Sequence, residues 1–393
     1  MTTQSRWLLP DGVDELLPLD AAHLEQLRRI ALDLLARWGY QLCMPPIVEF
    51  LDSLLSGVGE DLELQTFKLT DQISGRMLGI PADITPQIAR IDAHRLPYEG
   101  PQRLCYLGPI LHTRPDKFAG SRNPLQVGAE LYGHAGIDAD AEIQSLMLAL
   151  LASLGVHDVT LEICHMGIFR GLSAAAKLPL EADSRLLNAL LRKDHTEVDD
   201  TLATARVSAD LADLFRSLLD LHGDATVVAQ AESRLDGAPA PVTAAVQSLS
   251  ALVVQLQQRC PRAPIHVDLA ELRGYHYHTG LMFAAYTRGF GRAIAWGGRY
   301  DNVGAYFGRA RPATGFSTDL KLLASISALP RKVEPAIFAP AGCVPALQSA
   351  IEALRSAGHV VIQALPGQSG ATHEARCAQQ LREVAGSWQL QNL

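Results

Sequence analysis

The sequence predicts an α+β fold, with strands paired as hairpins and helices in separate segments. Two stretches, Thr66 to Ile80 and Thr279 to Trp296, have apolar runs on either side of a polar or glycine-rich turn, which is typical of β-hairpins. Two others, Ala21 to Trp38 and Ile137 to Leu154, carry apolar residues at helical spacing. Hairpins together with long amphipathic helices indicate the α+β class.

Length and charge narrow the class of protein further. The chain has 393 residues, of which 48% are hydrophobic and 19% charged, enough for one large core and a smaller domain. Its net charge is −8. Affinity for nucleic-acid phosphates comes mainly from lysine and arginine, so we expect no nucleic-acid partner. No window approaches the roughly 20 apolar residues of a membrane span and the N-terminus lacks the apolar core of a signal peptide, which predicts a cytoplasmic protein with no membrane partner.

The cysteines give no sign of a metal site or of disulfides. The chain has six, scattered singly, with no Cys-x-x-Cys and no histidine and cysteine group at zinc spacing. We expect reduced, mostly buried thiols, as in a cytosolic protein, and neither a metal nor a cofactor.

The N-terminal third is expected to alternate helices and short strands. Asp20 can cap a helix from Ala21 to about Trp38, and Gly39 can close it. The elements expected after it are a strand that starts at Tyr40 and ends at the pair Pro45 and Pro46, a short helix from Glu49 to Glu60 that ends in a glycine-rich loop, the hairpin from Thr66 to Ile80, a helix opened by residues 81–87, and two strands within residues 104–133 joined by a polar loop.

The middle of the chain is predicted to be mainly helical. After the helix from Ile137 to Leu154 comes a strand, Val159 to Ile163. Residues from about 165 to 262 are rich in leucine and alanine and are expected to form a helical insertion. This insertion carries no group of side chains that suggests catalysis, and its surface is a plausible site for protein contacts.

Residues 265–301 contain the densest group of polar rings in the chain. A strand-like run, Ile265 to Leu269, precedes Arg273 and the four rings of residues 275–278. In an extended strand Arg273, Tyr275 and Tyr277 would share one face, with His276 and His278 on the other. Two interpretations of this pattern stay open. It is explained by a plain β-hairpin without a ligand. It is also explained by the floor of a binding pocket, because a guanidinium binds a carboxylate in bidentate fashion and a ring packs against a flat ligand.

Residues 331–393 are predicted to form a small C-terminal α/β appendix after a main domain of residues 1–330. The expected elements are a strand from Ala336 to Ala339, a helix from Pro345 to Gly358, a strand from Val360 to Gln363, a helix from Glu374 to Val384 and a closing segment at Trp388.

Four short segments resemble histidyl-tRNA synthetase. Residues 273–279 are similar to its second histidine-binding signature, Arg-Gly-Leu-Asp-Tyr-Tyr-Thr, and residues 297–301 repeat the Gly-Gly-Arg-Tyr-Asp that follows it. Residues 81–85 are similar to its Arg-Pro-Glu-Gly-Thr, and residues 126–130 match its Gln-x-Gly-x-Glu. The resemblance covers residues 1–330. It implies the class II aminoacyl-tRNA-synthetase fold, an antiparallel sheet flanked by helices, with a helical insertion at about 165–262.

The resemblance also implies a site for L-histidine. In that family the acid and threonine of the segment that matches residues 81–85 hold the amino group of histidine, which points to Asp83 and Thr85 here. An aspartate two residues before Thr-Pro is, however, more often a helix cap. Gln126 and Glu130 match the residues that recognise the imidazole and amino group. Arg273 should take the carboxylate. The implied histidine-binding set is Asp83, Thr85, Gln126, Glu130, Arg273, Tyr277 and His278, and the sequence departs from the family at Pro81, Tyr275, His276 and His278.

The residues that would grip ATP in that family are replaced. His112 stands at the position of the arginine that clamps the α-phosphate, and Arg114 at that of the following acid. In the third sequence motif of class II synthetases an arginine binds the γ-phosphate, and Leu322 stands at its position here. Asp319 and Lys321 stand where that motif has a glycine and an acid. A neutral histidine and a leucine cannot supply the positive charge that adenylate formation needs. We therefore expect no catalytic residues and no enzyme activity of its own.

A sequence that keeps the histidine-binding residues but lacks the ATP-binding ones resembles the histidyl-tRNA-synthetase paralogues that serve as regulatory subunits of ATP phosphoribosyltransferase in the first step of histidine biosynthesis. The resemblance implies a short catalytic subunit as partner in a hetero-octamer, a requirement for that subunit's activity, L-histidine as feedback effector, and a self-dimer through the Pro45 and Pro46 region. A surface helix and an edge strand would explain that last region without a partner. Two other functions stay open, an active histidyl-tRNA synthetase and a free-standing histidine-sensing scaffold.

Overall fold

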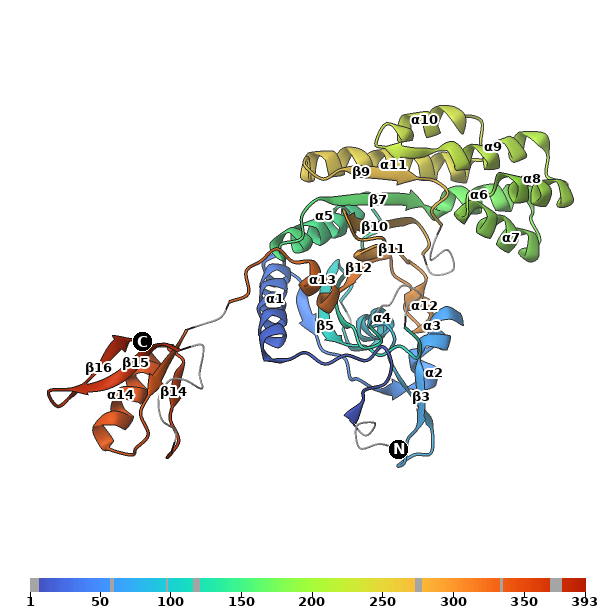
Figure 1. The fold of residues 1–393 in the computed structure, drawn as a ribbon. Helices are drawn as coiled ribbons and strands as arrows, with labels where there is room; N and C mark the ends of the chain where they lie inside the picture. The colour runs from blue at the N-terminus through green and yellow to red at the C-terminus, as the bar shows by residue number, and fades with distance from the viewer. Residues whose placement is uncertain are drawn as a thin grey trace. The chain divides into compact units, whose positions relative to one another are not determined.

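The computed structural model describes residues 7–56, 60–96, 98–115, 121–272, 278–332, 335–367 and 377–393 (Figure 1). The chain separates into two compact units. The first contains residues up to 16 and 24–329, and the second contains residues 17–23 and 330–393. None of the helices in the described part of the chain is long and apolar enough to cross a membrane.

A mixed sheet of nine strands forms the centre of the first unit, as far as the described residues show. The pairs β1 with β5 and β7 with β9 are parallel, and the other neighbours are antiparallel. The expected antiparallel sheet is therefore confirmed for the central strands only. In sheet order the strands are β1 (Gln41–Cys43), β5 (Gln102–Pro109), β6 (Leu125–Tyr132), β12 (Ala313–Asp319), β11 (Ala295–Arg299), β10 (Leu281–Thr287), β7 (Val159–His165), β9 (Ile265–Asp268) and β8 (His222–Asp224).

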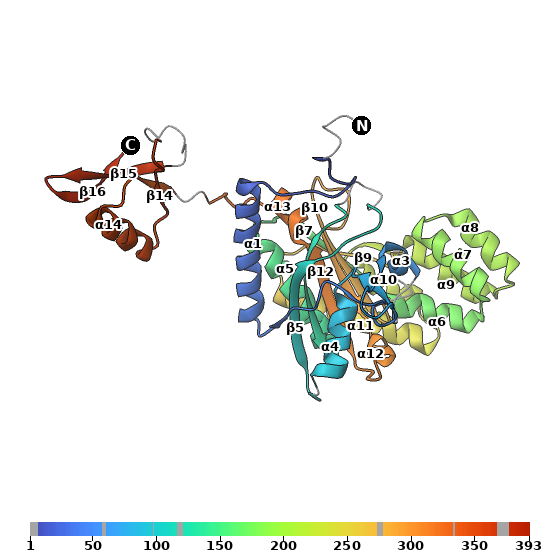
Figure 2. The ribbon, with the colours of Figure 1, turned by 90° about the horizontal axis from the view of Figure 1, so that it is seen from below.

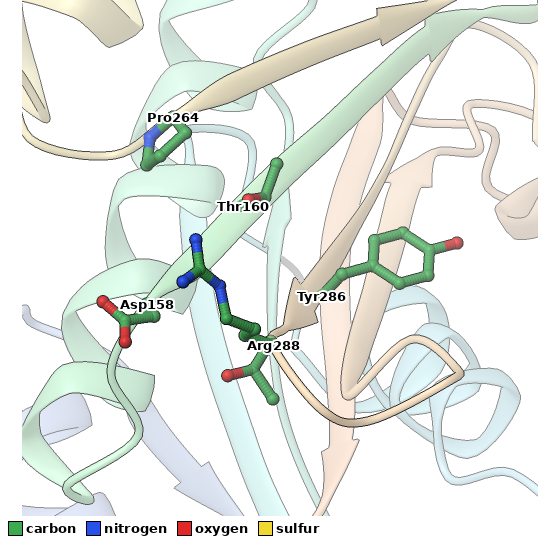
Figure 3. Close-up of a pocket in the computed structure, with 6 residues that line it drawn as sticks. Asp158, Thr160, Pro264, Tyr286 and Arg288 are labelled. Carbon is green, nitrogen blue, oxygen red and sulfur yellow. The ribbon is translucent and has the colours of Figure 1, made fainter.

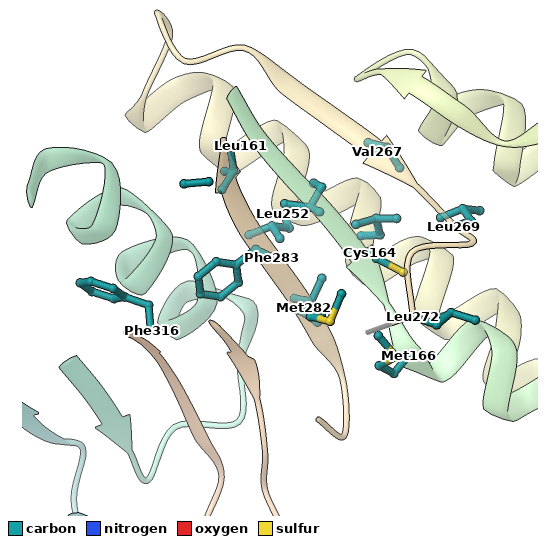
Figure 4. Packing of buried hydrophobic residues seen from close by; sticks show 14 of the residues in the cluster. Leu161, Cys164, Met166, Leu252, Val267, Leu269, Leu272, Met282, Phe283 and Phe316 are labelled. Carbon is teal, nitrogen blue, oxygen red and sulfur yellow. The ribbon is translucent and has the colours of Figure 1, made fainter. Parts of the chain in front are cut away.

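The two faces of this sheet belong to two hydrophobic clusters. On one face Val127, Phe283 and Phe316 pack with helix α5 (Ile137–Ser153) and helix α1 (Pro18–Arg37), and Figure 4 shows part of this cluster. On the other face Tyr106 and Tyr300 pack with helix α4 (Thr85–Arg95) in a smaller cluster. Alternate residues of each strand point to opposite faces, so the same strands supply both clusters.

The insertion is helical, as predicted, and it also adds β8 to one edge of the sheet. Figure 2 shows the helices of residues 166–220 gathered at one end of the first unit, whereas those of residues 227–259 lie closer to the sheet. The helices of the insertion are α6 (Met166–Ala176), α7 (Leu180–Leu191), α8 (His195–Thr204), α9 (Ala209–Asp220), α10 (Val227–Arg234) and α11 (Ala240–Arg259).

The segment after α1 confirms one prediction and corrects another. The strand expected to end at the proline pair is β1, which stops before Pro45 because proline cannot donate to a ladder, and a further short strand, β2 (Glu49–Phe50), follows the pair. The helix expected from Glu49 to Glu60 is wrong in extent, because Glu49 and Phe50 belong to β2 and the helix that follows them covers only Leu51–Leu54. The remaining elements of this unit are α2 (Leu51–Leu54), α3 (Glu60–Gln65), β3 (Phe67–Thr70), β4 (Met77–Ile80), α12 (Val303–Tyr306) and α13 (Leu320–Ile326), with β2, β4 and β3 forming a separate small sheet.

The second unit contains a sheet in the order β14, β13, β15, β16 and the helix α14 (Pro345–Ser356). The helix expected from Glu374 to Val384 is wrong, because residues 377–384 form a strand that pairs with both β13 and β16. Ala385 and Gly386 both have positive φ and form the tight turn of this hairpin. The strands are β13 (Ala336–Ala339), β14 (Val361–Gln363), β15 (Cys377–Val384) and β16 (Ser387–Asn392).

Candidate functional site

Four of the predicted histidine-binding residues meet at the start of α4 and along β6. We call Asp83, Thr85, Gln126 and Glu130 the amino-acid cluster. The first two lie in the turn that opens α4, and the other two lie four residues apart on β6, so they share one face of the sheet. Thr85, Gln126 and Glu130 are buried, whereas Asp83 is partly exposed. The four residues that the family resemblance grouped therefore also lie together in the fold.

Gln126 joins the two halves of this cluster. Its side-chain oxygen accepts a hydrogen bond from the backbone N–H of Ile84 at 2.9 Å, and its amide Nε2 donates to Asp83 Oδ1 at 2.8 Å. The same Asp83 oxygen accepts from the backbone N–H of Thr85 at 3.0 Å, but the N-cap residue of α4 is Ile84, so Asp83 is not the helix cap. Among the described residues the second Asp83 oxygen has no hydrogen-bond partner, which leaves an acceptor for a ligand.

Glu130 is 1% exposed, and its described hydrogen-bond partners are hydroxyl groups. Oε1 lies 3.1 Å from the Thr85 hydroxyl and 3.2 Å from that of Tyr106, and Oε2 accepts from the Tyr300 hydroxyl. The pKa of Glu130 is raised to about 8, mainly because the group is buried; the nearby Asp83 charge contributes to the rise, and the hydroxyl hydrogen bonds oppose it. A cation bound beside Glu130 would therefore stabilise the charged form of this carboxyl group.

Two glycines make room for these side chains. A Cβ at Gly128 would collide with the Tyr106 hydroxyl, and a Cβ at Gly315 would collide with the Glu130 carboxylate. Gly315 lies opposite Glu130 in the pairing of β12 with β6, and Gly298 lies opposite Gly315 on the next strand. The row of Gly315 and Gly298 therefore carries no side chains of its own, and the Glu130 carboxylate occupies the space over Gly315.

His278 lies at the other end of this glycine row. Its half-buried ring lies against Gly298, where a Cβ would collide with it. Because Gly298 and Gly315 are in register with Glu130, the ring lies on the Glu130 face of the sheet, two strands away. Arg273 and Tyr277, the other two members of the predicted set, lie outside the described residues.

Tyr106 and Tyr300 were missed by the sequence reasoning. Tyr300 belongs to the Gly-Gly-Arg-Tyr-Asp segment, so its position was a usable signal. Tyr106 is fully buried on β5, where it pairs with Gly128 on β6. Only the strand register places its hydroxyl beside Thr85 and Glu130, and burial raises its pKa so that it stays protonated.

The positions that would grip ATP in a synthetase hold side chains with structural contacts. We call His112, Asp319, Lys321 and Leu322 the phosphate positions. His112 Nε2 lies 3.0 Å from the carbonyl oxygen of Ala82, and Leu322 packs against the main hydrophobic cluster. Asp319 caps α13 by accepting from the backbone N–H of Lys321 at 3.0 Å, and also accepts from that of Leu125 at 3.1 Å. Lys321 Nζ lies 3.2 Å from Asp14. Arg114, which follows His112 by two residues, is exposed.

Other candidate sites are weaker. No group of three or more histidine, cysteine, aspartate or glutamate side chains in the described residues has the geometry to hold a metal ion. A depression of about 360 Å³ lies at the ends of β7 and β10 (Figure 3), but Asp158 and Arg288 in its lining are exposed and no predicted site residue takes part. A second, of about 430 Å³, lies between α6 and α11.

The two parts of the chain match two family models. Residues 12–323 match histidyl-tRNA synthetase, and residues 334–391 match the ATP phosphoribosyltransferase subunit HisZ C-terminal domain. The chain is also similar over its whole length to proteins named ATP phosphoribosyltransferase regulatory subunit. That of Chromohalobacter salexigens is 52% identical over 393 residues and that of Thioalkalivibrio sulfidiphilus 50% identical over 395, with all of each chain covered.

Solved structures show the same fold. An ATP phosphoribosyltransferase regulatory subunit/histidyl-tRNA synthetase from Bacillus halodurans has a TM-score of 0.83 at 24% identity, covering 97% of this chain and 98% of that one. A histidyl-tRNA synthetase from Nostoc sp. PCC 7120 has a TM-score of 0.76 at 17% identity, covering 96% and 91%. The predicted class II synthetase-like fold is thereby confirmed.

Proposed function

The chain belongs to the family of ATP phosphoribosyltransferase regulatory subunits, and we propose that it performs this role by binding L-histidine at the amino-acid cluster. The regulatory role is non-catalytic and requires a catalytic partner. What the proposal adds is the effector, the site that binds it and the coupling to the partner.

Glu130 is the observation that carries the histidine proposal. A carboxyl group that is 1% exposed and hydrogen bonded to hydroxyl groups has no compensating positive charge among its described contacts. An isolated buried charge is costly, whereas a buried carboxylate beside a cation is stabilised. The ammonium group of an amino acid fits this need, and the open oxygen of Asp83 offers it a second acceptor.

In this proposal the rest of the ligand lies on the same face of the sheet, next to the row of Gly315 and Gly298. The Glu130 carboxylate covers Gly315 and the ring of His278 covers Gly298, so the imidazole is proposed to contact these two groups. Arg273 is proposed to bind the ligand carboxylate as a bidentate fork, with Tyr277 packing beside it. Gln126 is already held by Asp83 and Ile84, so it is preorganised for a polar contact.

Histidine controls the catalytic subunit in this proposal by favouring one conformation of the complex. A ligand shifts such an equilibrium only through a difference in affinity between the two states. Linkage then requires the catalytic subunit to change the affinity for histidine by the same factor that histidine changes the subunit's binding. This reciprocity provides a direct measurement of the coupling.

The proposed assembly is a hetero-octamer with the short catalytic subunit, built on a self-dimer at residues 21–49. Leu42, Met44 and Ile47 are 42%, 76% and 59% exposed in the segment around β1. β1 is also an edge strand of the nine-stranded sheet, and on its outer side it pairs with no other described strand. Apolar side chains grouped at a sheet edge favour an interface with a second copy.

Two further features complete the proposal. We place the functional boundary between the synthetase-like part and the appendix at residues 330 and 331. We also propose a cytoplasmic location, which the six free cysteines support because thiols stay reduced in that compartment.

Titration calorimetry with the purified complex tests the coupling. L-Histidine is titrated into the regulatory chain alone and into the chain saturated with the short catalytic subunit. We expect two different dissociation constants, and the same ratio when the catalytic subunit is titrated with and without histidine. Equal affinities in both titrations would remove histidine at this site as the effector, while leaving the regulatory role in place.

A second measurement separates this role from that of a synthetase. Histidine-dependent exchange of labelled pyrophosphate into ATP should stay at the blank level, because His112 and Leu322 supply no cation to the phosphates. Exchange above the blank would contradict the non-catalytic role.

A further inference from the structure

Two short flanks connect the segment that contains Arg273 to the rest of the sheet. Residues 268–272 precede this arginine, and residues 278–280 lead from the segment into β10. Arg273 follows directly after Leu272, and consecutive Cα atoms are about 3.8 Å apart. The first flank therefore limits where the chain can place the residue that is proposed to bind the ligand carboxylate.

The first flank is held on its outer side by the helical insertion. β8, which belongs to the insertion, pairs with β9, and the backbone N–H of Leu269 donates to the carbonyl oxygen of Leu221 at 3.1 Å. Leu269 and Leu272 are each 1% exposed and pack into the main hydrophobic cluster (Figure 4). The chain is thus held in place up to the residue before Arg273.

Asp268 joins this flank to the turn between α7 and α8. The residue is 8% exposed, and its Oδ2 lies 2.8 Å from Lys193 Nζ. Its Oδ1 accepts from the backbone N–H of Ala270 at 3.0 Å, and its carbonyl oxygen accepts from that of Glu271 at 3.2 Å. Asp268 therefore shapes the bend after β9 and binds a cation of the insertion at the same time.

Lys193 is fixed in its turn by the backbone around it. It has a positive φ of 53°, and its N–H donates to the carbonyl oxygen of Leu190 at 2.9 Å. The next residue, Asp194, caps α8 by accepting from the backbone N–H of Glu197 at 3.0 Å. The turn thus holds the lysine in a defined place, from which its Nζ reaches the carboxylate of Asp268.

The second flank also contacts the insertion. The backbone N–H of Met166, the first residue of α6, donates to the carbonyl oxygen of Gly280 at 2.9 Å. His278, two residues before Gly280, lies against Gly298 on the Glu130 face of the sheet. Both flanks are therefore tied to the insertion, although the insertion supplies no residue to the amino-acid cluster.

We propose that Lys193 is a positioning residue for the histidine site, acting through Asp268 on the flank that leads to Arg273. This inference rests on the proposed histidine function. A buried carboxylate that loses its cation is left with an uncompensated charge, so its surroundings rearrange to solvate it. Such a rearrangement displaces the flank. Removing the lysine charge should therefore weaken the contact with the ligand carboxylate and leave the ammonium contacts at Asp83 and Glu130 in place.

Calorimetry with two ligands tests the proposal. L-Histidinol has a hydroxymethyl group where L-histidine has its carboxylate, so it keeps the ammonium and imidazole but lacks the group that Arg273 is proposed to bind. In Lys193→Met the affinity for L-histidine should fall about 2- to 30-fold, the range for residues that modulate a site without touching the ligand. The affinity for L-histidinol should stay within about twofold of the wild type. Lys193→Arg keeps the cation and should bind both ligands as the wild type does.

Two further variants isolate the ion pair. Arg216→Met is the matched control, because the described ion pairs of Arg216 join α8 and α9 through Asp199 and Asp213 and do not reach β9. It should leave both affinities unchanged. Asp268→Asn keeps an acceptor oxygen but needs no cation, so adding Lys193→Met to it should cause no further fall in L-histidine affinity.

The outcomes separate this inference from the proposed function. Equal L-histidine affinity of the wild type and Lys193→Met would overturn the inference alone. An equal fall for both ligands would show a general loss of structure and would also overturn the positioning role. Absence of L-histidine binding by the wild type would overturn the proposed function and the positioning role together.

Discussion

The amino-acid cluster and the phosphate positions lie on the same sheet but have different kinds of contact. In the cluster, Asp83 keeps an open oxygen and Glu130 is a buried acid held by hydroxyl groups, so both keep a capacity for a ligand. At the phosphate positions, Asp319 caps a helix and Leu322 packs into the core, so both are used within the fold. The difference supports the proposal that the cluster binds a ligand, whereas the described contacts of the phosphate positions lie within the fold.

This difference predicts two kinds of mutational effect. Changes in the cluster and its ligands should alter histidine affinity. Changes at the phosphate positions should alter stability and leave histidine affinity unaffected, because their described contacts are internal to the fold.

The largest effect is expected from Arg273→Ala. Removing one member of a desolvated charge pair costs about 2–5 kcal/mol, so the affinity for L-histidine should fall roughly 30-fold to several thousand-fold. Calorimetry on the wild type and the variant measures this. His112→Ala is the matched control at a phosphate position and should bind histidine as the wild type does. An unchanged affinity in Arg273→Ala would mean that the carboxylate is bound elsewhere.

Gly315→Ala tests whether the cluster depends on the glycine row. The added methyl would occupy the space of the Glu130 carboxylate, so the acid must move. Overpacking of this kind costs about 1–3 kcal/mol of the free energy of unfolding, and histidine affinity should fall as well. Gly291→Ala is the control, because no atom lies within 4 Å of its added Cβ. Denaturant unfolding should show a loss for Gly315→Ala alone, and equal stability of the two variants would refute the tight fit.

A pH dependence of binding follows from Glu130. Its raised pKa of about 8 keeps it protonated in the free site at neutral pH, whereas the ligand ammonium favours the carboxylate. Binding should therefore release a proton, and affinity should rise with pH up to about 8, by at most about tenfold per unit. Calorimetry in two buffers with different ionisation enthalpies counts the proton. In Glu130→Gln the proton release should disappear, and a release that persists would assign it to another group.

The sequence predicted which four residues form the amino-acid cluster, but it did not predict the side chains that surround them. Short motifs fix the spacing of Asp83 with Thr85 and of Gln126 with Glu130, and each pair lies within a single turn or strand. The contact between the two pairs, and the place of Tyr106 beside them, depend on strand register across β5 and β6, which local spacing does not reveal.

In the C-terminal appendix, by contrast, the local sequence predicted the wrong type of element. Residues 377–384 contain alanine, glutamine, leucine and glutamate, which favour helices, yet they form β15. The strand is stabilised by its neighbours β13 and β16, with Leu381 buried beneath α14 in the small core. The turn residues Ala385 and Gly386 were the available signal for a hairpin.

The smallest effect is expected from Asp319→Ala. Its carboxylate accepts from the backbone N–H groups of Lys321 and Leu125, so the variant removes a helix cap and leaves two donors without this partner. Loss of a cap costs about 1 kcal/mol, with a range of 0.5–2. The free energy of unfolding should fall by about that amount while L-histidine affinity stays within twofold of the wild type. Asp319→Asn, which keeps an acceptor oxygen, should recover much of the loss. A fall in histidine affinity without a fall in stability would place Asp319 in the ligand site, and the division between a binding half and a structural half would then have to be redrawn.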